Sequence, residues 1–171
     1  MNVAKRLAQA LAVVLGAWLQ VSWFGHIRPL GVMPNLMLVI VVLFGLWSDA
    51  TAALAAAIGG GFLLDLASGS DFGLRMAFYV VVVLALVAGK QLGLHADSLA
   101  TPVLAVILGT VIYNLAVLAT LGTLPLNGVV VGRVAAELLD NLVLLGLVTL
   151  VRLNLPRRSH TTLELGKGPG G

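Results

Sequence analysis

The sequence predicts an all-α, polytopic membrane protein with six transmembrane helices. Sixty per cent of its 171 residues are hydrophobic and only 10% are charged, and its mean hydropathy of +1.07 is far above that of soluble domains. The apolar residues form long continuous runs, which favours helices over the alternating strands of a membrane barrel. Because one helical span needs about 20 residues, six crossings take up most of the chain.

The first half of the chain contains three apolar stretches, residues 7–24, 36–47 and 50–66. The first follows Lys5 and Arg6, lacks the small-x-small cleavage site of a signal peptide, and is interpreted as a retained helix. The second is short for a span, so we expect residues 30–34 to help complete it. The third begins after Ser48 and Asp49, which break the apolar sequence and are interpreted as a loop.

The second half contains three more stretches, residues 74–89, 99–121 and 134–151. The turn-forming and charged residues 68–71, 90–97 and 122–128 lie between the predicted helices and are interpreted as short loops. We expect one transmembrane domain over residues 1–158. Residues 159–171, which are rich in glycine and polar side chains, predict a disordered cytoplasmic tail.

The basic residues predict the orientation of the chain in the membrane. With six crossings, seven of the ten fall on one side, namely Lys5, Arg6, Lys90, Arg152, Arg157, Arg158 and Lys167. The other three, Arg28, Arg75 and Arg133, fall on the opposite side. Positive charge is enriched in cytoplasmic loops, so both termini are predicted to be cytoplasmic.

The composition also argues against several functions. The chain has no cysteine, and its net charge of +3 comes from basic residues too scattered for a nucleic-acid-binding surface. No hydrolase, metalloprotease, phosphate-loop or dinucleotide motif is present in the sequence. We therefore expect a non-enzymatic protein with no catalytic residue, metal ion or cofactor.

Small residues recur at every fourth position of the first stretch, at Ala8, Ala12 and Gly16. Such spacing makes a smooth helix face on which another backbone can approach closely in lipid. The face serves either for packing within the bundle or for docking a helix of a partner protein. The first helix suits docking best, because a terminal helix is expected to be peripheral.

Ionisable residues gather at one predicted membrane level, in its outer half. Arg133, Glu137, Asp140 and Asn141 share one helical face by their spacing, and Asp65 and Arg75 lie at the adjoining ends of the third and fourth helices. Charges in hydrocarbon must turn inward and find partners. We predict a structural polar network in which Arg133 pairs with Glu137 and Asp65 pairs with Arg75. Asp140 is expected to be neutral, or paired through Asn114 or Asn141. A pocket for a small solute and a proton relay are the alternatives.

Two short motifs carry a resemblance to a known family. They are Pro34-Asn35-Leu36 and Gly61-Phe62-Leu63-Leu64-Asp65, the latter followed by Ser68-Gly69-Ser70-Asp71-Phe72-Gly73. With these motifs the chain resembles MreD, the rod-shape-determining membrane protein of bacteria. The resemblance implies a bacterial inner-membrane subunit of the cell-elongation machinery for peptidoglycan synthesis. Its implied partners are MreC, most directly, together with RodA, a class B penicillin-binding transpeptidase and the MreB filament.

The same family is similar in fold to the six-helix S components of energy-coupling vitamin transporters, which bind solutes. That similarity supplies the alternative function. A scaffold predicts charges that satisfy one another and leave no sizeable cavity, whereas a solute-binding protein predicts a pocket of about 300 Å³ or more at their level.

Overall fold

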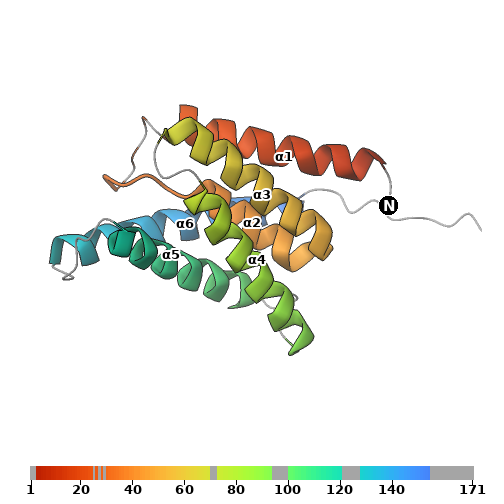
Figure 1. The fold of residues 1–171 in the computed structure, drawn as a ribbon. Helices are drawn as coiled ribbons and strands as arrows, with labels where there is room; N and C mark the ends of the chain where they lie inside the picture. Colours follow the sequence, from red (N-terminus) through yellow and green to blue (C-terminus); the bar gives the residue numbers. More distant parts are fainter. Residues whose placement is uncertain are drawn as a thin grey trace, which may run out of the picture.

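The chain folds into a bundle of helices in the computed structural model, which describes residues 3–24, 26, 28, 30–69, 73–93, 100–120 and 128–154. Within these ranges it forms six α-helices and no strand, which confirms the all-α prediction for this part of the chain (Figure 1). Of the predicted loop at 122–128, only Gly128 is described, as the first residue of the last helix, and the predicted tail at 159–171 lies outside the described residues. The helices are α1 (Val3–Ser22), α2 (Leu36–Trp47), α3 (Ala50–Ser68), α4 (Leu74–Gln91), α5 (Ala100–Thr120) and α6 (Gly128–Asn154).

Four of the described helices, α3, α4, α5 and α6, are long and apolar enough to cross a membrane. These helices indicate a membrane-embedded protein. Helix α2 is apolar but has only 12 residues. Helix α1 has 20 residues, which include Lys5, Arg6 and two glutamines. Six crossings therefore remain a prediction.

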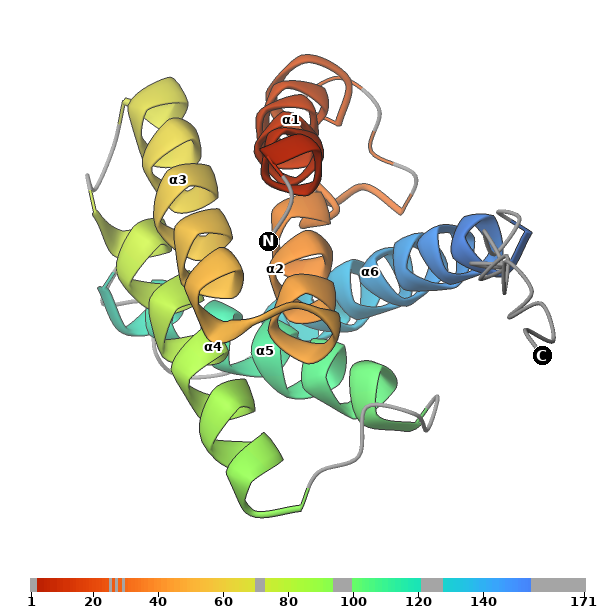
Figure 2. The ribbon, with the colours of Figure 1, turned by 90° about the vertical axis from the view of Figure 1, so that its right-hand side faces the viewer.

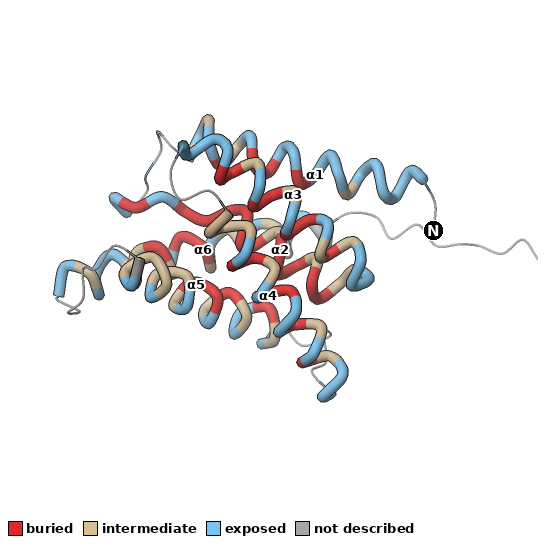
Figure 3. The backbone as a smooth tube through the Cα atoms, viewed as in Figure 1, coloured by how far each residue is buried: buried red, intermediate tan, exposed pale blue. Residues whose placement is uncertain are grey.

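Helix α2 is the centre of the bundle. It contacts all five other helices, and in Figure 2 it lies between α1 and α3 on one side and α5 and α6 on the other. Nine of its twelve residues are buried, because nearly every residue of its sequence is apolar and no polar face exists to turn outward. Figure 3 shows the contrast with α1, whose outer side is exposed along most of its length.

Two adjacent glycines allow α3 to approach two of its three neighbours, α2 and α4. A Cβ atom added at Gly61 would overlap the backbone of Met76 in α4, and one added at Gly60 would overlap the Met37 side chain in α2. Only a glycine leaves room for such close backbone contact. The glycine-rich run therefore serves packing inside the bundle.

Helix α2 has the predicted bounds, but the segment before it and the start of α6 differ from the prediction. Residues 30–35 are not helical, so they do not extend α2 as a helix. Pro34 cannot supply a backbone N–H, and Asn35 takes the N-cap position, which ends the irregular segment and starts α2. Helix α6 begins at Gly128, six residues before the predicted stretch, so Arg133 lies inside the helix rather than at its start.

The end of the bundle that holds the α2–α3 turn is fixed by side chains from two other helices. Gln9 Nε2 in α1 donates to the hydroxyl of Ser48 at 3.3 Å, and Lys90 Nζ in α4 lies 3.4 Å from the Ser48 carbonyl oxygen. Asp49 caps α3 by accepting from the Ala52 N–H at 3.3 Å. The turn therefore links α1, α2, α3 and α4.

Candidate functional site

Most of the buried polar side chains gather at the opposite end of the bundle, which we call the junction. There the last turns of α1 and α3 meet the first turns of α2 and α4 and the facing parts of α5 and α6. A buried polar group is costly unless it is hydrogen-bonded, so the partners at the junction indicate what each group does. The buried polar residues are Gln20, Asn35, Asp65, Thr110, Glu137, Asp140 and Asn141.

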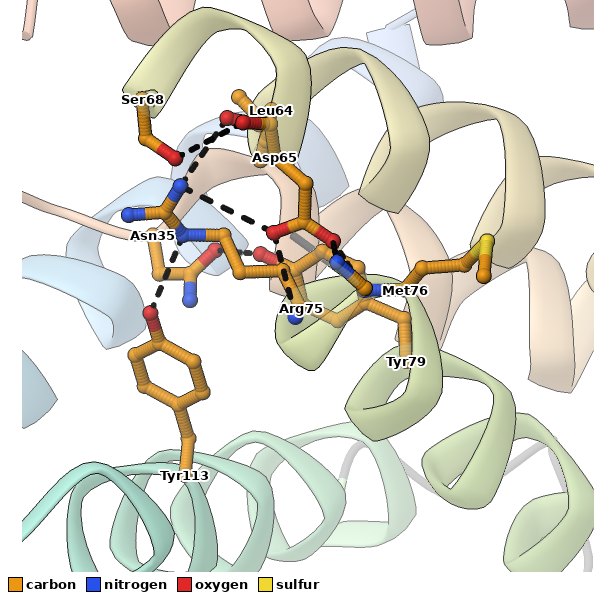
Figure 4. Close-up of polar contacts among 9 residues, drawn as sticks. Asn35, Leu64, Asp65, Ser68, Arg75, Met76, Tyr79 and Tyr113 are labelled. Carbon is orange, nitrogen blue, oxygen red and sulfur yellow. Dashed lines mark hydrogen bonds and ion pairs between the residues drawn. The ribbon is translucent and has the colours of Figure 1, made fainter. Parts of the chain in front are cut away.

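The carboxylate of Asp65, at the end of α3, caps the start of α4 (Figure 4). Its Oδ2 accepts from the backbone N–H groups of Gly73 at 3.0 Å and Met76 at 3.1 Å, and its Oδ1 accepts from the Arg75 N–H at 3.3 Å. Gly73 is the N-cap residue of α4 and has no side chain to perform this role. A negative charge at a helix N-terminus is also favourable. Asp65 therefore joins α3 and α4 through the backbone.

The Arg75 side chain turns back onto α3 and reaches α5. Its Nη1 lies 4.0 Å from Oδ1 of Asp65 and donates to the Leu64 carbonyl oxygen at 3.0 Å, and its Nε donates to the Tyr113 hydroxyl at 3.4 Å. The Asp65 side chain is almost fully buried, while the Arg75 side chain keeps 30% of its surface exposed. The structure thus brings together the two charges that the sequence predicts to tie the third and fourth helices.

The start of α2 is held by amide side chains. Three backbone N–H groups in its first turn have side-chain acceptors: Asn35 N–H donates to Asn141 Oδ1 at 2.7 Å, Met37 N–H to Gln20 Oε1 at 2.8 Å, and Leu38 N–H to Asn35 Oδ1 at 3.0 Å. A helix that starts inside a bundle has no water for these groups, so side chains must replace it.

Through its side chain and its backbone N–H, Asn35 also connects α2 with three other helices. Its Oδ1 accepts a second hydrogen bond from the Tyr79 hydroxyl of α4 at 2.7 Å. Asn141 of α6, which accepts from the Asn35 N–H, donates through Nδ2 to the Thr110 hydroxyl of α5 at 2.9 Å. Tyr79, Thr110 and Asn141 are fully buried. This chain of hydrogen bonds fixes α2, α4, α5 and α6 relative to one another.

The predicted ion pair between Arg133 and Glu137 is not formed. Arg133 is exposed, and no carboxylate lies within 4 Å of it among the described residues. Glu137 instead accepts a hydrogen bond from Asn114 Nδ2 at 3.0 Å. Glu137 is buried and bonds to α5, while Arg133, one turn earlier on α6, stays exposed at the rim of the bundle, where it keeps its charge in contact with solvent.

Asp140 also has a partner other than those predicted. The Leu30 backbone N–H donates to its carboxylate, and its Oδ2 is buried without a hydrogen-bond partner among the described residues. Asn114 and Asn141, the predicted partners, bond to Glu137 and to Asn35 instead. The predicted network is therefore two clusters, one around Asp65 and one around Asn35.

The three small residues of α1 that were predicted to form one face differ in their exposure. Ala8 and Ala12 are exposed, but Gly16 is buried against α2, where an added Cβ would overlap the Ile40 side chain. The three residues therefore do not form one docking face, because Gly16 is used for packing inside the bundle. Only Ala8 and Ala12 remain available to a partner.

A polar pocket of about 340 Å³ opens at the junction. Its lining includes the charged residues Arg75, Arg133 and Glu137. Uncharged polar groups come from Gln20, Asn35, Ser68 and Tyr113, and apolar walls come from residues such as Val32 and Leu64. Its size exceeds the threshold of about 300 Å³ set for a solute-binding protein, which a purely packed scaffold does not predict.

Sequence reasoning missed several residues of the junction. Four of them are uncharged side chains that stand among apolar residues and therefore attract little notice in the sequence: Gln20, Tyr79, Thr110 and Tyr113. The available signal was the spacing of Thr110 and Asn114, which share a helical face of α5. Of the family-motif residues, Leu36 is buried, Phe62 is exposed, and Phe72 lies outside the described residues.

Comparison with known proteins does not assign the chain. No family model, no curated protein and no solved structure matches it. The residues and their geometry therefore carry the functional interpretation. Among the described residues, no three histidine, aspartate or glutamate side chains come together as metal ligands.

Proposed function

We propose that the chain is a non-enzymatic integral membrane subunit of the bacterial cell-elongation complex, where it scaffolds or regulates MreC and the cell-wall synthases. The resemblance of its two motifs to MreD supports this proposal. In it, RodA, a class B penicillin-binding transpeptidase and the MreB filament belong to the same assembly. The chain resides in the inner membrane as a six-span protein with both termini in the cytoplasm.

One observation carries the proposal: one polar side chain of each motif, Asn35 and Asp65, holds the start of a helix. Asp65 binds three N–H groups at the start of α4, and Asn35 binds one N–H at the start of α2 together with the Tyr79 hydroxyl. A carboxylate with both oxygens engaged by backbone groups is poorly suited to act as an acid, a base or a nucleophile. The motifs are best explained as the fixed points of a rigid helical scaffold.

The decisive experiment is affinity purification of the tagged chain from bacterial membranes, followed by identification of the co-purifying proteins. We expect MreC, RodA and the transpeptidase to be enriched over a tagged inner-membrane protein of similar size and unrelated function. Depletion of the chain should convert rod-shaped cells to round cells. Purification without any of these partners, in cells that keep their shape on depletion, would contradict the proposal.

Within this proposal, α1 supplies the contact with the single membrane helix of MreC. Ala8 and Ala12 are exposed and small, so the variant Ala8→Leu/Ala12→Leu should push an approaching backbone away and reduce MreC recovery. Ala85→Leu, on an exposed face of α4, is the matched control and should leave recovery unchanged. Equal recovery with both variants would exclude this face of α1.

The pocket at the junction favours a second candidate function, a solute-binding S component of a vitamin transporter. Arg75, Arg133 and Glu137 give the pocket both signs of charge. A screen of water-soluble metabolites for thermal stabilisation tests this candidate, because a ligand that binds only the folded protein raises its stability. A metabolite that stabilises the wild type but not Glu137→Gln would favour solute binding over the scaffold.

A further inference from the structure

A second cavity lies next to the junction pocket, between the segment before α2 and the first turns of α6. It has a volume of about 500 Å³, and we call it the arginine cleft. Two arginines line it, Arg28 and Arg133, and no acidic residue is part of its lining. Among the residues that the structure describes, the cleft is therefore a concave site with positive charge only.

Among the described residues, neither arginine side chain has a hydrogen-bond acceptor. Each is exposed, and within the described ranges neither forms an ion pair. Arg75 shows the contrast, because Asp65, Leu64 and Tyr113 use its donors. A guanidinium group presents its N–H donors in a planar fork that fits the two oxygens of a phosphate or carboxylate. Two such groups on one cavity are suited to hold an oxyanion.

No carboxylate of α6 lines the cleft, although Glu137, one turn from Arg133, attracts that arginine electrostatically. Glu137 lies on the side of the junction pocket and bonds to Asn114. Asp140 accepts from the Leu30 N–H, so it holds the segment that forms one wall of the cleft. Neither carboxylate is part of the cleft lining. The wall thus has a fixed anchor on α6, which distinguishes the cleft from two arginines on an open surface.

The space in the cleft depends on small residues. Gly132 and Ala136, one turn apart on α6, face it, and an added Cβ at Gly132 would meet nothing within 4 Å. Gly31, with φ of +79°, turns the opposite wall. Leu30, Val32 and Met33 add an apolar side. The cleft can therefore take a group that is anionic at one end and apolar at the other.

We propose that the arginine cleft binds a phosphate or carboxylate group, with Arg28 and Arg133 as its ligands. The shared chemistry is an oxyanion, and its source is either an anionic phospholipid headgroup or a soluble anion. The proposal does not depend on the function of the chain in the cell-elongation complex, since it concerns a ligand other than the partner proteins. Its failure would leave the co-purification experiment unaffected.

The experiment measures the melting temperature of the purified full chain in neutral detergent. One arm adds inorganic phosphate and compares it with chloride at equal ionic strength. The other arm adds phosphatidylglycerol and compares it with phosphatidylcholine. We expect one or both anions to raise the melting temperature, as a ligand of the folded state must. Stabilisation by phosphatidylglycerol alone identifies a lipid headgroup, and stabilisation by inorganic phosphate identifies a soluble anion.

Three variants test whether the cleft is the site. Arg28→Gln and Arg133→Gln should each lower the apparent affinity about tenfold, because each removes one charge-assisted contact. Gly132→Leu should abolish binding by filling the cleft, while the net charge of the protein is unchanged and its melting temperature without ligand is not lowered. Arg6→Gln removes an exposed basic residue near the other end of the molecule and is the control that should retain binding.

Three results would overturn the proposal. The first is a melting temperature that neither anion raises. The second is an equal reduction of affinity in Arg6→Gln and Arg133→Gln, which would show that the anion responds to overall charge. The third is full binding by Gly132→Leu, which would place the ligand outside the cleft.

Discussion

Replacing Asp65 by alanine should detach the start of α4 from the end of α3. The carboxylate is almost fully buried and accepts from three backbone N–H groups of α4 while it faces the Arg75 guanidinium at 4.0 Å. Alanine supplies none of these acceptors. The first turn of α4 then has three N–H groups without a side-chain partner, and Arg75 no longer has its counter-charge.

The magnitude follows from the interactions that alanine removes. An ordinary helix cap contributes about 1 kcal/mol, whereas removing one partner of a buried charge pair costs about 3–5 kcal/mol. Arg75 keeps its bonds to Leu64 and Tyr113 and is partly exposed, which moderates the effect. We expect Asp65→Ala to lower the free energy of unfolding by about 3 kcal/mol. Asp65→Asn should cost less, because its amide keeps one of the two acceptor oxygens.

The assay combines equilibrium unfolding in mixed detergent micelles with amide hydrogen exchange. Exchange should accelerate at Arg75 and Met76 in Asp65→Ala, while Met37 and Leu38 at the start of α2 keep their protection. Asp49→Ala is the matched control, since Asp49 caps α3 at an exposed position with one N–H at 3.3 Å. Its cost should stay near 1 kcal/mol, which is about the value of a single exposed cap.

A double-mutant cycle with Arg75→Met separates the charge pair from the cap. If the pair contributes, the double variant should be less damaged than the sum of the single variants, by about 0.5 kcal/mol or more. An Asp65→Ala protein as stable as Asp49→Ala, with unchanged exchange at Met76, would refute the capping role. A strictly additive cycle would refute the ion pair but leave the cap intact.

Three further predictions concern the packing, the amide cluster and the orientation of the chain. Gly61→Ala should destabilise the protein by about 1–3 kcal/mol because the added Cβ overlaps the backbone of Met76. The control, Gly132→Ala in open space on α6, should be neutral or stabilising in the same unfolding assay. Asn35→Ala should cost about 1–3 kcal/mol, since it removes the acceptor that the Leu38 N–H and the Tyr79 hydroxyl share, and hydrogen exchange at Leu38 should report this change. Reporter fusions after Lys90 and after Arg158 should both read cytoplasmic, and an external reading at either residue would contradict the six-span orientation.

The sequence by itself determined the helical class and the level of the polar residues. Hydropathy decides which residues enter the lipid. Inside lipid, backbone N–H and C=O groups must hydrogen-bond to one another, so long apolar runs form helices. The same reasoning required the charged face of α6 and Asp65 to turn inward. The structure buries Asp65, Glu137 and Asp140 but leaves Arg133 exposed. The short second run already indicated an unusual helix, because 12 residues span only about 18 Å.

Only the tertiary structure decided which groups are partners. Spacing along α6 placed Glu137 one turn from Arg133 and so suggested an ion pair. Side chains of other helices compete for the same carboxylate, and Asn114 of α5 donates the hydrogen bond to it. Similarly, the small residues of α1 share a face by spacing alone, yet the rotation of the helix buries Gly16 against α2 and leaves Ala8 exposed. Helix rotation and crossing geometry depend on the packing of all six helices, which a single periodic pattern does not contain.

The role of Asp65 shows the same division most clearly. Its charge, in a run of apolar residues, marked it as a group that needs a partner. That its partners are three backbone N–H groups of the next helix depends on the turn through Gly69 and Gly73, both with positive φ, which returns the chain to the carboxylate. The sequence therefore identified the group that must be satisfied. The fold decided which groups satisfy it, because only the folded chain brings the Arg75 N–H at the start of α4 to 3.3 Å from Oδ1 of Asp65 at the end of α3.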